Sequence, residues 1–314
     1  QEINNTINQM WSTAILELEP ESGNIVWEWH LWDHLIQDVS PDLPNYGVIS
    51  EHPELFDINC GDAGANIGGP QGSNGDWMHV NSIDYNENLD QIVISSRSQN
   101  EIFIIDHSTT TEEAAGHSGG NFGKGGDFLY RWGNPENYDS GNESHQILNA
   151  QHGVNWITEG YPGSGNLIIF NNFHDTNHSE SAVLEIVTPI NESGTYNLAL
   201  NNTYGPFNFE MEYSNNFTTP IQGGAFRLYN GNTLITQTHT SRIIEVDYYG
   251  EIIWDYSFEL GNASYWIARA QKYSIDYFDN VVNVLPGDVN NDGIINILDI
   301  VSTVNIVLGL ADQV

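Results

Sequence analysis

Basic residues are scarce in this chain of 314 residues: seven Lys and Arg stand against 42 Asp and Glu, for a formal net charge of −35. A surface this acidic repels phosphate backbones and anionic headgroups, so we expect neither nucleic acid nor a membrane as a partner. Such acidity keeps an exported protein soluble, and we expect a secreted or periplasmic location. An anionic substrate would have to be drawn in by a local positive group.

Cysteine and long apolar runs are also nearly missing. Cys60 is the one cysteine and cannot form an internal disulfide. We find no apolar run long enough to span a membrane and no signal peptide. The polar residues 1–9 lead directly into a strand pattern, so we expect a further N-terminal piece that belongs to the same fold.

Helical periodicity is almost absent before residue 286, and strand patterns recur instead as units of four. Each unit ends in an aromatic-rich strand that follows turn residues. The expected strands are 78–85, 91–97, 101–107 and 128–132; then 153–157, 166–171, 182–187 and 207–213; then 225–229, 233–238, 242–247 and 251–256.

The spaced aromatic repeat favours an all-β fold of the β-propeller type over a sandwich, with residues 1–280 as the propeller domain. Residues 11–29 are typical of the outer half of one blade, and a strand around residues 266–273 would close the ring or begin another unit. About three and a half blades are visible, fewer than the usual four to eight or so, so we expect N-terminal blades to be missing.

A different segment begins at Pro286, and residues 281–314 are predicted to form a linker and a single calcium-binding repeat. Oxygen ligands recur at calcium-loop spacing, and Gly293 permits the sharp turn. The predicted ligands are Asp288, Asn290, Asp292, the Ile294 carbonyl, Asn296 and Asp299. An apolar run over residues 300–308 predicts a helix after the loop. The alternative is an Asn/Asp/Gly turn that holds no metal.

Polar side chains in the first complete unit suggest an anion site. His79 and Asn81 are two residues apart on a predicted strand and so would share a face. Antiparallel pairing about a turn centred on Asn88 would bring Arg97 beside His79. Three hydrogen-bond donors around one point suit a tetrahedral oxyanion such as a sulfate ester.

His152 begins the first strand of the next unit, as His79 does in its own. First strands of propeller blades line the central channel, so both imidazoles could reach one axial pocket, where one could act as a nucleophile. The plainer interpretation is a packed or capping histidine beside an exposed Arg97.

Several motifs resemble the bacterial arylsulfotransferase (aryl-sulfate sulfotransferase) family. They lie at residues 27–38, 76–86, 105–111, 116–121, 130–135 and 231–235. The likeness runs from about residue 12 to 258. The calcium segment is similar to one repeat of a type I dockerin, since it has Asp at loop position 12 and lacks the preceding helix. A complete dockerin has two such repeats and only one is seen here, which weighs against cohesin binding; the resemblance leaves a cohesin-like or an intramolecular partner open.

The resemblance implies a six-bladed propeller that transfers a sulfuryl group from an aryl sulfate to a phenol without PAPS. It implies that His152 becomes transiently sulfated, while His79, Asn81 and Arg97 bind the sulfuryl oxygens. The chain departs from the family in beginning after the blade that carries a further active-site histidine, and in having Gly153 where the family has Asp. The alternatives are a non-catalytic propeller serving as an extracellular binding or scaffold module, and a sulfatase that transfers to water.

Overall fold

The computed structural model describes residues 10–60, 75–175, 177, 179–199, 201–258, 266–275, 277, 289 and 294–307. It divides into two compact units, Gln1–Ala270 and Gln271–Val314. The predicted boundary at residue 280 lies outside the described residues. Within the described part of the chain, no helix has the length and apolar character needed to cross a membrane.

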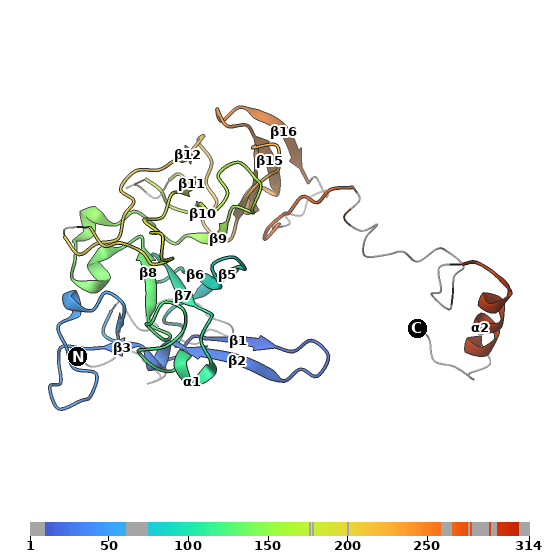
Figure 1. The fold of residues 1–314 in the computed structure, drawn as a ribbon. Helices are drawn as coiled ribbons and strands as arrows, with labels where there is room; N and C mark the ends of the chain where they lie inside the picture. Colours follow the sequence, from blue (N-terminus) through green and yellow to red (C-terminus); the bar gives the residue numbers. More distant parts are fainter. Residues whose placement is uncertain are drawn as a thin grey trace. The chain divides into compact units, whose positions relative to one another are not determined.

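Four-stranded antiparallel sheets carry most of the described β-structure, and in each the strands follow chain order (Figure 1). The first contains β5 (Val80–Asn86), β6 (Gln91–Ser96), β7 (Glu101–Asp106) and β8 (Phe128–Trp132); the second β9 (His152–Trp156), β10 (Leu167–Asn171), β11 (Ala182–Ile186) and β12 (Met211–Tyr213); the third β13 (Gly224–Arg227), β14 (Thr233–Gln237), β15 (Arg242–Val246) and β16 (Ile252–Ser257). The predicted units of four strands are therefore confirmed, although β12 is shorter than its pattern.

The first strands of successive sheets pack together, β5 on β9 and β9 on β13. Side chains that alternate along a strand fill the layers on its two sides. Leu167 and Ile169 of β10 pack in the layer shared with the first sheet, whereas Ile168 and Phe170 pack in the layer shared with the third. This burial on both faces explains why the middle strands are continuous apolar runs.

The segment before the first sheet forms an antiparallel hairpin, β1 (Ala14–Leu18) and β2 (Ile25–His30), and a parallel pair, β3 (Leu35–Ile36) and β4 (Phe56–Asp57). Trp27 and Trp29 of β2 are buried in one cluster with Phe103 and Ile105 of β7. The expected half-unit of residues 11–29 is thus a hairpin packed on the first sheet. Among the described residues of the unit Gln1–Ala270, the short helices are α1 (Thr111–Ala114) and the 3-10 turns Leu31–Asp33, Ile49–Glu51, Pro135–Tyr138, Glu143–His145 and Thr238–Thr240.

The strand predicted around residues 266–273 is not formed. The Ala268 carbonyl accepts bonds from Gly223 N (3.3 Å) and Thr238 Oγ1 (3.5 Å), and the Arg269 guanidinium lies 5.7 Å from the Phe226 ring centroid. Isolated backbone and side-chain contacts to the third sheet thus replace a regular ladder.

The second unit contains α2 (Ile297–Val307), which begins three residues before its predicted start at residue 300. The Asn296 side chain accepts a 2.7 Å bond from Leu298 N. Asparagine is a strong N-cap because its side-chain oxygen satisfies an unpaired N–H of the first turn. That cap explains the earlier start.

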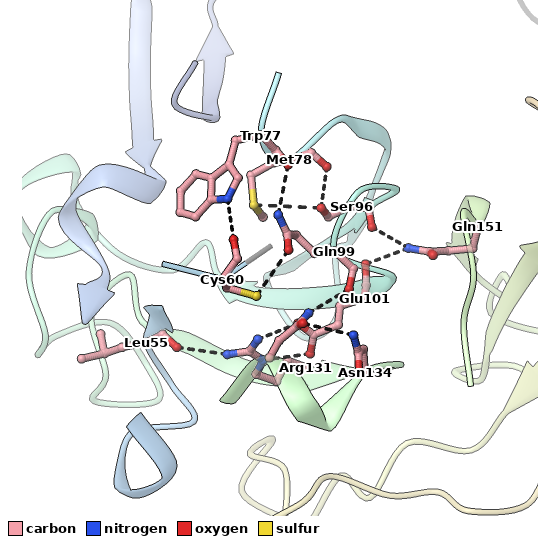
Figure 2. Close-up of polar contacts among 11 residues, drawn as sticks. Leu55, Cys60, Trp77, Met78, Ser96, Gln99, Glu101, Arg131, Asn134 and Gln151 are labelled. Carbon is pink, nitrogen blue, oxygen red and sulfur yellow. Dashed lines mark hydrogen bonds and ion pairs between the residues drawn. The ribbon is translucent and has the colours of Figure 1, made fainter. Parts of the chain in front are cut away.

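A buried ion pair joins the last two strands of the first sheet (Figure 2). Arg131 of β8 donates to both carboxylate oxygens of Glu101 at the start of β7, at 3.0 and 2.5 Å. Both side chains are fully buried. A third guanidinium bond, 3.0 Å to the Leu55 carbonyl, ties the N-terminal segment to the sheet. Two-point pairing and added hydrogen bonds are what such charges need to offset the loss of water.

Replacing Arg131 by Met should lower the free energy of unfolding by about 3–5 kcal/mol, because it leaves Glu101 buried without its cation. The control is Arg242→Met, which breaks the partly exposed pair between Arg242 and Asp255 and should cost less than about 1 kcal/mol. Urea unfolding followed by tryptophan fluorescence measures both. Equal losses in the two variants would contradict the structural role given to the buried pair.

Candidate functional site

His79 lies immediately before β5, and its backbone has φ of 48°, in the left-handed region. The strand expected from Met78 therefore begins at Val80, and the prediction that His79 and Asn81 share one strand face is wrong. Asp76 holds the histidine in place: one carboxylate oxygen accepts the His79 backbone N–H at 3.1 Å, and the other lies 2.5 Å from Nδ1. This contact assigns the proton to Nδ1 and turns Nε2 away from Asp76.

Arg97 is next to His79, as predicted, but the pairing that brings it there is different. Asn86 pairs with Gln91, Ser82 with Ser95 and Val80 with Ser96, so Asn81 is an extra residue, a β-bulge. The bulge shifts the register by one residue, and Arg97 N then donates to the His79 carbonyl at 3.2 Å.

Asn81 links the first sheet to the loop before β9. Its Nδ2 donates to the Gln151 carbonyl at 2.8 Å, which uses one of its two amide hydrogens. Its Oδ1 is buried and has no hydrogen-bond partner among the described residues. The second Nδ2 hydrogen and this carbonyl oxygen are what Asn81 has left for a ligand.

His152, the first residue of β9, is 8% exposed. Its Nδ1 lies 2.8 Å from Asn172 Oδ1 and 3.1 Å from the Ala150 carbonyl. Both neighbours are acceptors, so Nδ1 carries the proton and Nε2 carries the lone pair. That lone pair accepts a long bond, 3.3 Å, from Gln222 N.

Electrostatics keeps the His152 imidazole neutral at neutral pH. Burial lowers the pKa of His152 to about 4, and the nearby charges of Arg97 and His79 lower it as well, against the opposing effect of the Asn172 hydrogen bond. Burial also lowers the pKa of Arg97, while the Asp76 carboxylate raises it. A neutral imidazole within the electrostatic influence of a half-buried arginine can attack an electrophile whose oxygens are anionic.

Sequence reasoning missed the residues that hold these groups. Asp76 and Asn172 orient the two imidazoles, and Gln151 connects His152 to the first sheet through bonds of 2.9 Å from its Nε2 to the Ser96 and Glu101 carbonyls. Figure 2 shows Gln151 reaching toward the first sheet. Asn172 follows directly after β10, a position that could have drawn attention to it.

The predicted calcium ligands lie partly outside the described residues, namely Asp288, Asn290 and Asp292. Among the others, buried Asp299 accepts bonds from Val289 N (2.8 Å) and Asn296 N (2.7 Å) through its two carboxylate oxygens. Asn296 Nδ2 donates to the Ile294 carbonyl at 3.2 Å. Residues at loop positions 7, 9 and 12 are thus linked by hydrogen bonds, while the side-chain oxygen of Asn296 caps α2.

Comparison with solved structures finds remote likenesses. A protein of unknown function from Bacteroides caccae has a TM-score of 0.38 at 12% identity, with 80% of this chain and 56% of that chain covered. Virginiamycin B lyase from Staphylococcus aureus has 0.30 at 12%, covering 58% and 42%, and BamB from Moraxella catarrhalis has 0.31 at 11%, covering 59% and 40%. The chain spans about half the length of these structures.

No curated protein matches the chain significantly. The family model described as Arylsulfotransferase (ASST) matches residues 1–214. That match covers well over half of the 314 residues and includes His79, Asn81, Arg97 and His152. The protein therefore belongs to the arylsulfotransferase (ASST) family.

Proposed function

We propose that the chain catalyses transfer of a sulfuryl group from an aryl sulfate to a phenolic acceptor through a sulfohistidine at His152, without PAPS. The observation that carries the proposal is the state of His152. Asn172 fixes its Nδ1 proton, burial holds its pKa near 4, and its Nε2 lone pair is bonded only weakly, to Gln222 N. Family membership supports the reaction class.

The first half-reaction would form a bond between His152 Nε2 and sulfur while the sulfur–oxygen bond to the aryl group breaks. Arg97 would offset the charge on the sulfuryl oxygens, and the free hydrogen of Asn81 would supply a neutral donor. His79, with its Nδ1–H held by Asp76, would enter this step protonated at both ring nitrogens and give its Nε2 proton to the departing phenolate. A second phenol would then return its proton to His79, take the sulfuryl group and restore His152.

Attack requires Nε2 to leave the Gln222 N–H. The 3.3 Å length makes this bond weak. Once released, the Gln222 N–H is positioned beside Nε2 and can donate to a sulfuryl oxygen bound there. The same group would then hold the lone pair in the resting enzyme and stabilise charge during transfer.

The finer architecture that we propose is a six-bladed propeller whose first strands line the channel. The packing of β5 on β9 and of β9 on β13 supports it, because both imidazoles stand at the starts of these strands. The acidic composition supports a secreted or periplasmic location.

The His152→Ala variant should release no phenol from a chromogenic aryl sulfate, whereas the unchanged chain should release it faster when a second phenol is added. The matched control is His30→Ala, which removes a partly exposed histidine that faces Glu28 and should keep full activity. Release that is independent of the acceptor would indicate transfer to water. No release by a folded chain would favour the non-catalytic binding module, an alternative supported by the engaged Nε2 and by the tie between Asn81 and Gln151.

The pH profile of kcat/KM tests the neutral state of His152. The rate should fall on the acid side near pH 4, because only the unprotonated imidazole attacks, and the lowered pKa keeps it unprotonated above that pH. An acid limb near pH 6.5 would contradict the buried environment of His152.

Stability must be followed in the same experiment. The unfolded chain protonates the His152 imidazole below pH 6.5, whereas the folded chain protonates it only near pH 4. The free energy of unfolding therefore falls as the pH drops from 6.5 toward 4. The loss is at most roughly 3 kcal/mol. Circular dichroism at each pH separates unfolding from loss of the chemical step.

For the C-terminal segment we propose Ca²⁺ binding by Asp288, Asn290, Asp292, the Ile294 carbonyl, Asn296 and Asp299, and a cohesin-like or intramolecular partner. The hydrogen bonds that link Ile294 to Asn296 and Asn296 to Asp299, at loop positions 7, 9 and 12, support the ion. Exposed apolar side chains on α2 support a partner; they are Ile297, Leu298, Ile300, Val301 and Val304.

Asp299→Ala should abolish Ca²⁺ binding measured by calorimetry, because it removes both the carboxylate at position 12 and the bonds that shape the loop. Asn305→Ala, on α2 beyond the loop, is the control and should bind as tightly as the unchanged chain. Equal affinity in both variants would exclude this loop as the calcium site.

A further inference from the structure

A cluster of two histidines and an aspartate lies outside the site described above. His34 follows the 3-10 turn Leu31–Asp33, whereas His117 and Asp127 lie between α1 and β8. The Nδ1 atoms of both histidines lie 2.8 Å from the same oxygen, Asp127 Oδ1. The three atoms all fall within 4.8 Å of one another.

The second ring nitrogen of His34 decides what this cluster can hold. His34 Nε2 lies 2.8 Å from the Ala114 carbonyl, which can only accept, so Nε2 carries a hydrogen. A neutral imidazole then has a bare lone pair at Nδ1, facing an Asp127 oxygen. The two lone pairs repel unless a positive centre, either a proton or a metal ion, lies between them. The ring is fully buried, so water cannot relieve the contact.

The packing around His34 is rigid. Trp29 stacks on the imidazole, with 5.5 Å between ring centroids and 3° between planes, and its Nε1 donates to the Gly126 carbonyl at 2.7 Å. A Cβ on Gly126 would overlap both the Ala114 carbonyl and the His34 ring, so glycine is what allows this backbone to approach. A metal ligand whose other nitrogen donates to a backbone carbonyl and whose ring is fixed by packing is the usual arrangement in metalloproteins.

The cluster opens toward solvent through His117, whose side chain is 61% exposed. His117 lines an open pocket of about 530 Å³ together with Trp32, Tyr46 and His52. An ion can therefore enter from the pocket, and coordination positions not filled by protein would face it.

We propose that His34 Nδ1, His117 Nδ1 and an Asp127 carboxylate oxygen bind one divalent transition-metal ion of the Zn²⁺ class. Two imidazoles and a carboxylate suit Zn²⁺, and Ca²⁺ and Mg²⁺ prefer sites made of oxygen alone. Zinc bonds of about 2.0–2.1 Å place neighbouring ligand atoms about 3.3 Å apart. Both 2.8 Å contacts need to open by about half an ångström, which requires the exposed His117 side chain to turn outward and the Asp127 carboxylate to turn away from the fixed His34 ring. Three protein ligands leave a position for water or an anion in the pocket.

The test is Zn²⁺ binding to the metal-stripped full chain, measured by calorimetry in buffer with excess Ca²⁺ so that the C-terminal loop is saturated. We expect one Zn²⁺ site per chain. His117→Ala should weaken it by about tenfold or more, since even the loss of a residue behind a ligand typically costs about that much. The control is His52→Ala, which removes another histidine of the same pocket, one that faces Glu54, and should leave Zn²⁺ affinity unchanged.

Co²⁺ provides a spectroscopic readout that does not depend on activity. The unchanged chain and His52→Ala should show the visible absorption of a low-coordinate nitrogen and oxygen site, and His117→Ala should lose it. Azide should shift the spectrum if an open position faces the pocket. Absence of Zn²⁺ binding in the unchanged chain, or equal binding in His117→Ala, would overturn the proposal and leave a proton between His34 and Asp127.

Discussion

The buried pair of Arg131 and Glu101 is the interaction on which the placement of the candidate site depends. Glu101 stands at the start of β7, and its backbone carbonyl receives the Gln151 side chain, which directly precedes His152. The guanidinium reaches the Leu55 carbonyl in the opposite direction. One desolvated charge pair therefore joins the N-terminal segment, the first sheet and the loop that leads into His152. Because such a pair tolerates little movement, it positions these parts more sharply than apolar packing alone.

The site itself combines groups with opposite requirements. His152 needs burial to stay neutral, while the anionic donor that we propose would need the positive charge of Arg97. The protein satisfies both requirements because Arg97 is only half-buried near a buried imidazole. Asp76 fixes the orientation of the neighbouring His79. In a chain with a net charge of −35, this local grouping is what would make the approach of a sulfate ester favourable.

Most of the sheet structure could be predicted, because apolar alternation and aromatic outer strands report directly on burial. Strands β6 and β7 lie within one residue of their predicted ends. For the candidate site, the closeness of Arg97 to His79 could be predicted, but not the local backbone that produces it. The bulge at Asn81 and the left-handed backbone of His79 depend on contacts with Asp76 and Gln151. Those contacts come from residues outside the strands, Asp76 before β5 and Gln151 before β9, and neither strand periodicity nor residue spacing encodes them. The strand expected near residue 266 failed for a related reason, because irregular contacts with the third sheet replaced a ladder.

The extra residue in β5 has a consequence for how this hairpin can change in evolution. Because Asn81 lies in a bulge, the hairpin carries one more residue before its turn than after it. Residues inserted in the turn at 87–90 would leave the pairing of Val80 with Ser96 intact. A single deletion at Asn81 would remove the bulge but leave Ser82 opposite Ser95 and Val80 opposite Ser96, so Arg97 would stay beside His79 while the amide that donates to the Gln151 carbonyl would be lost. Relatives that keep this link to the loop before β9 should therefore vary in length at the turn and retain the extra residue at the bulge.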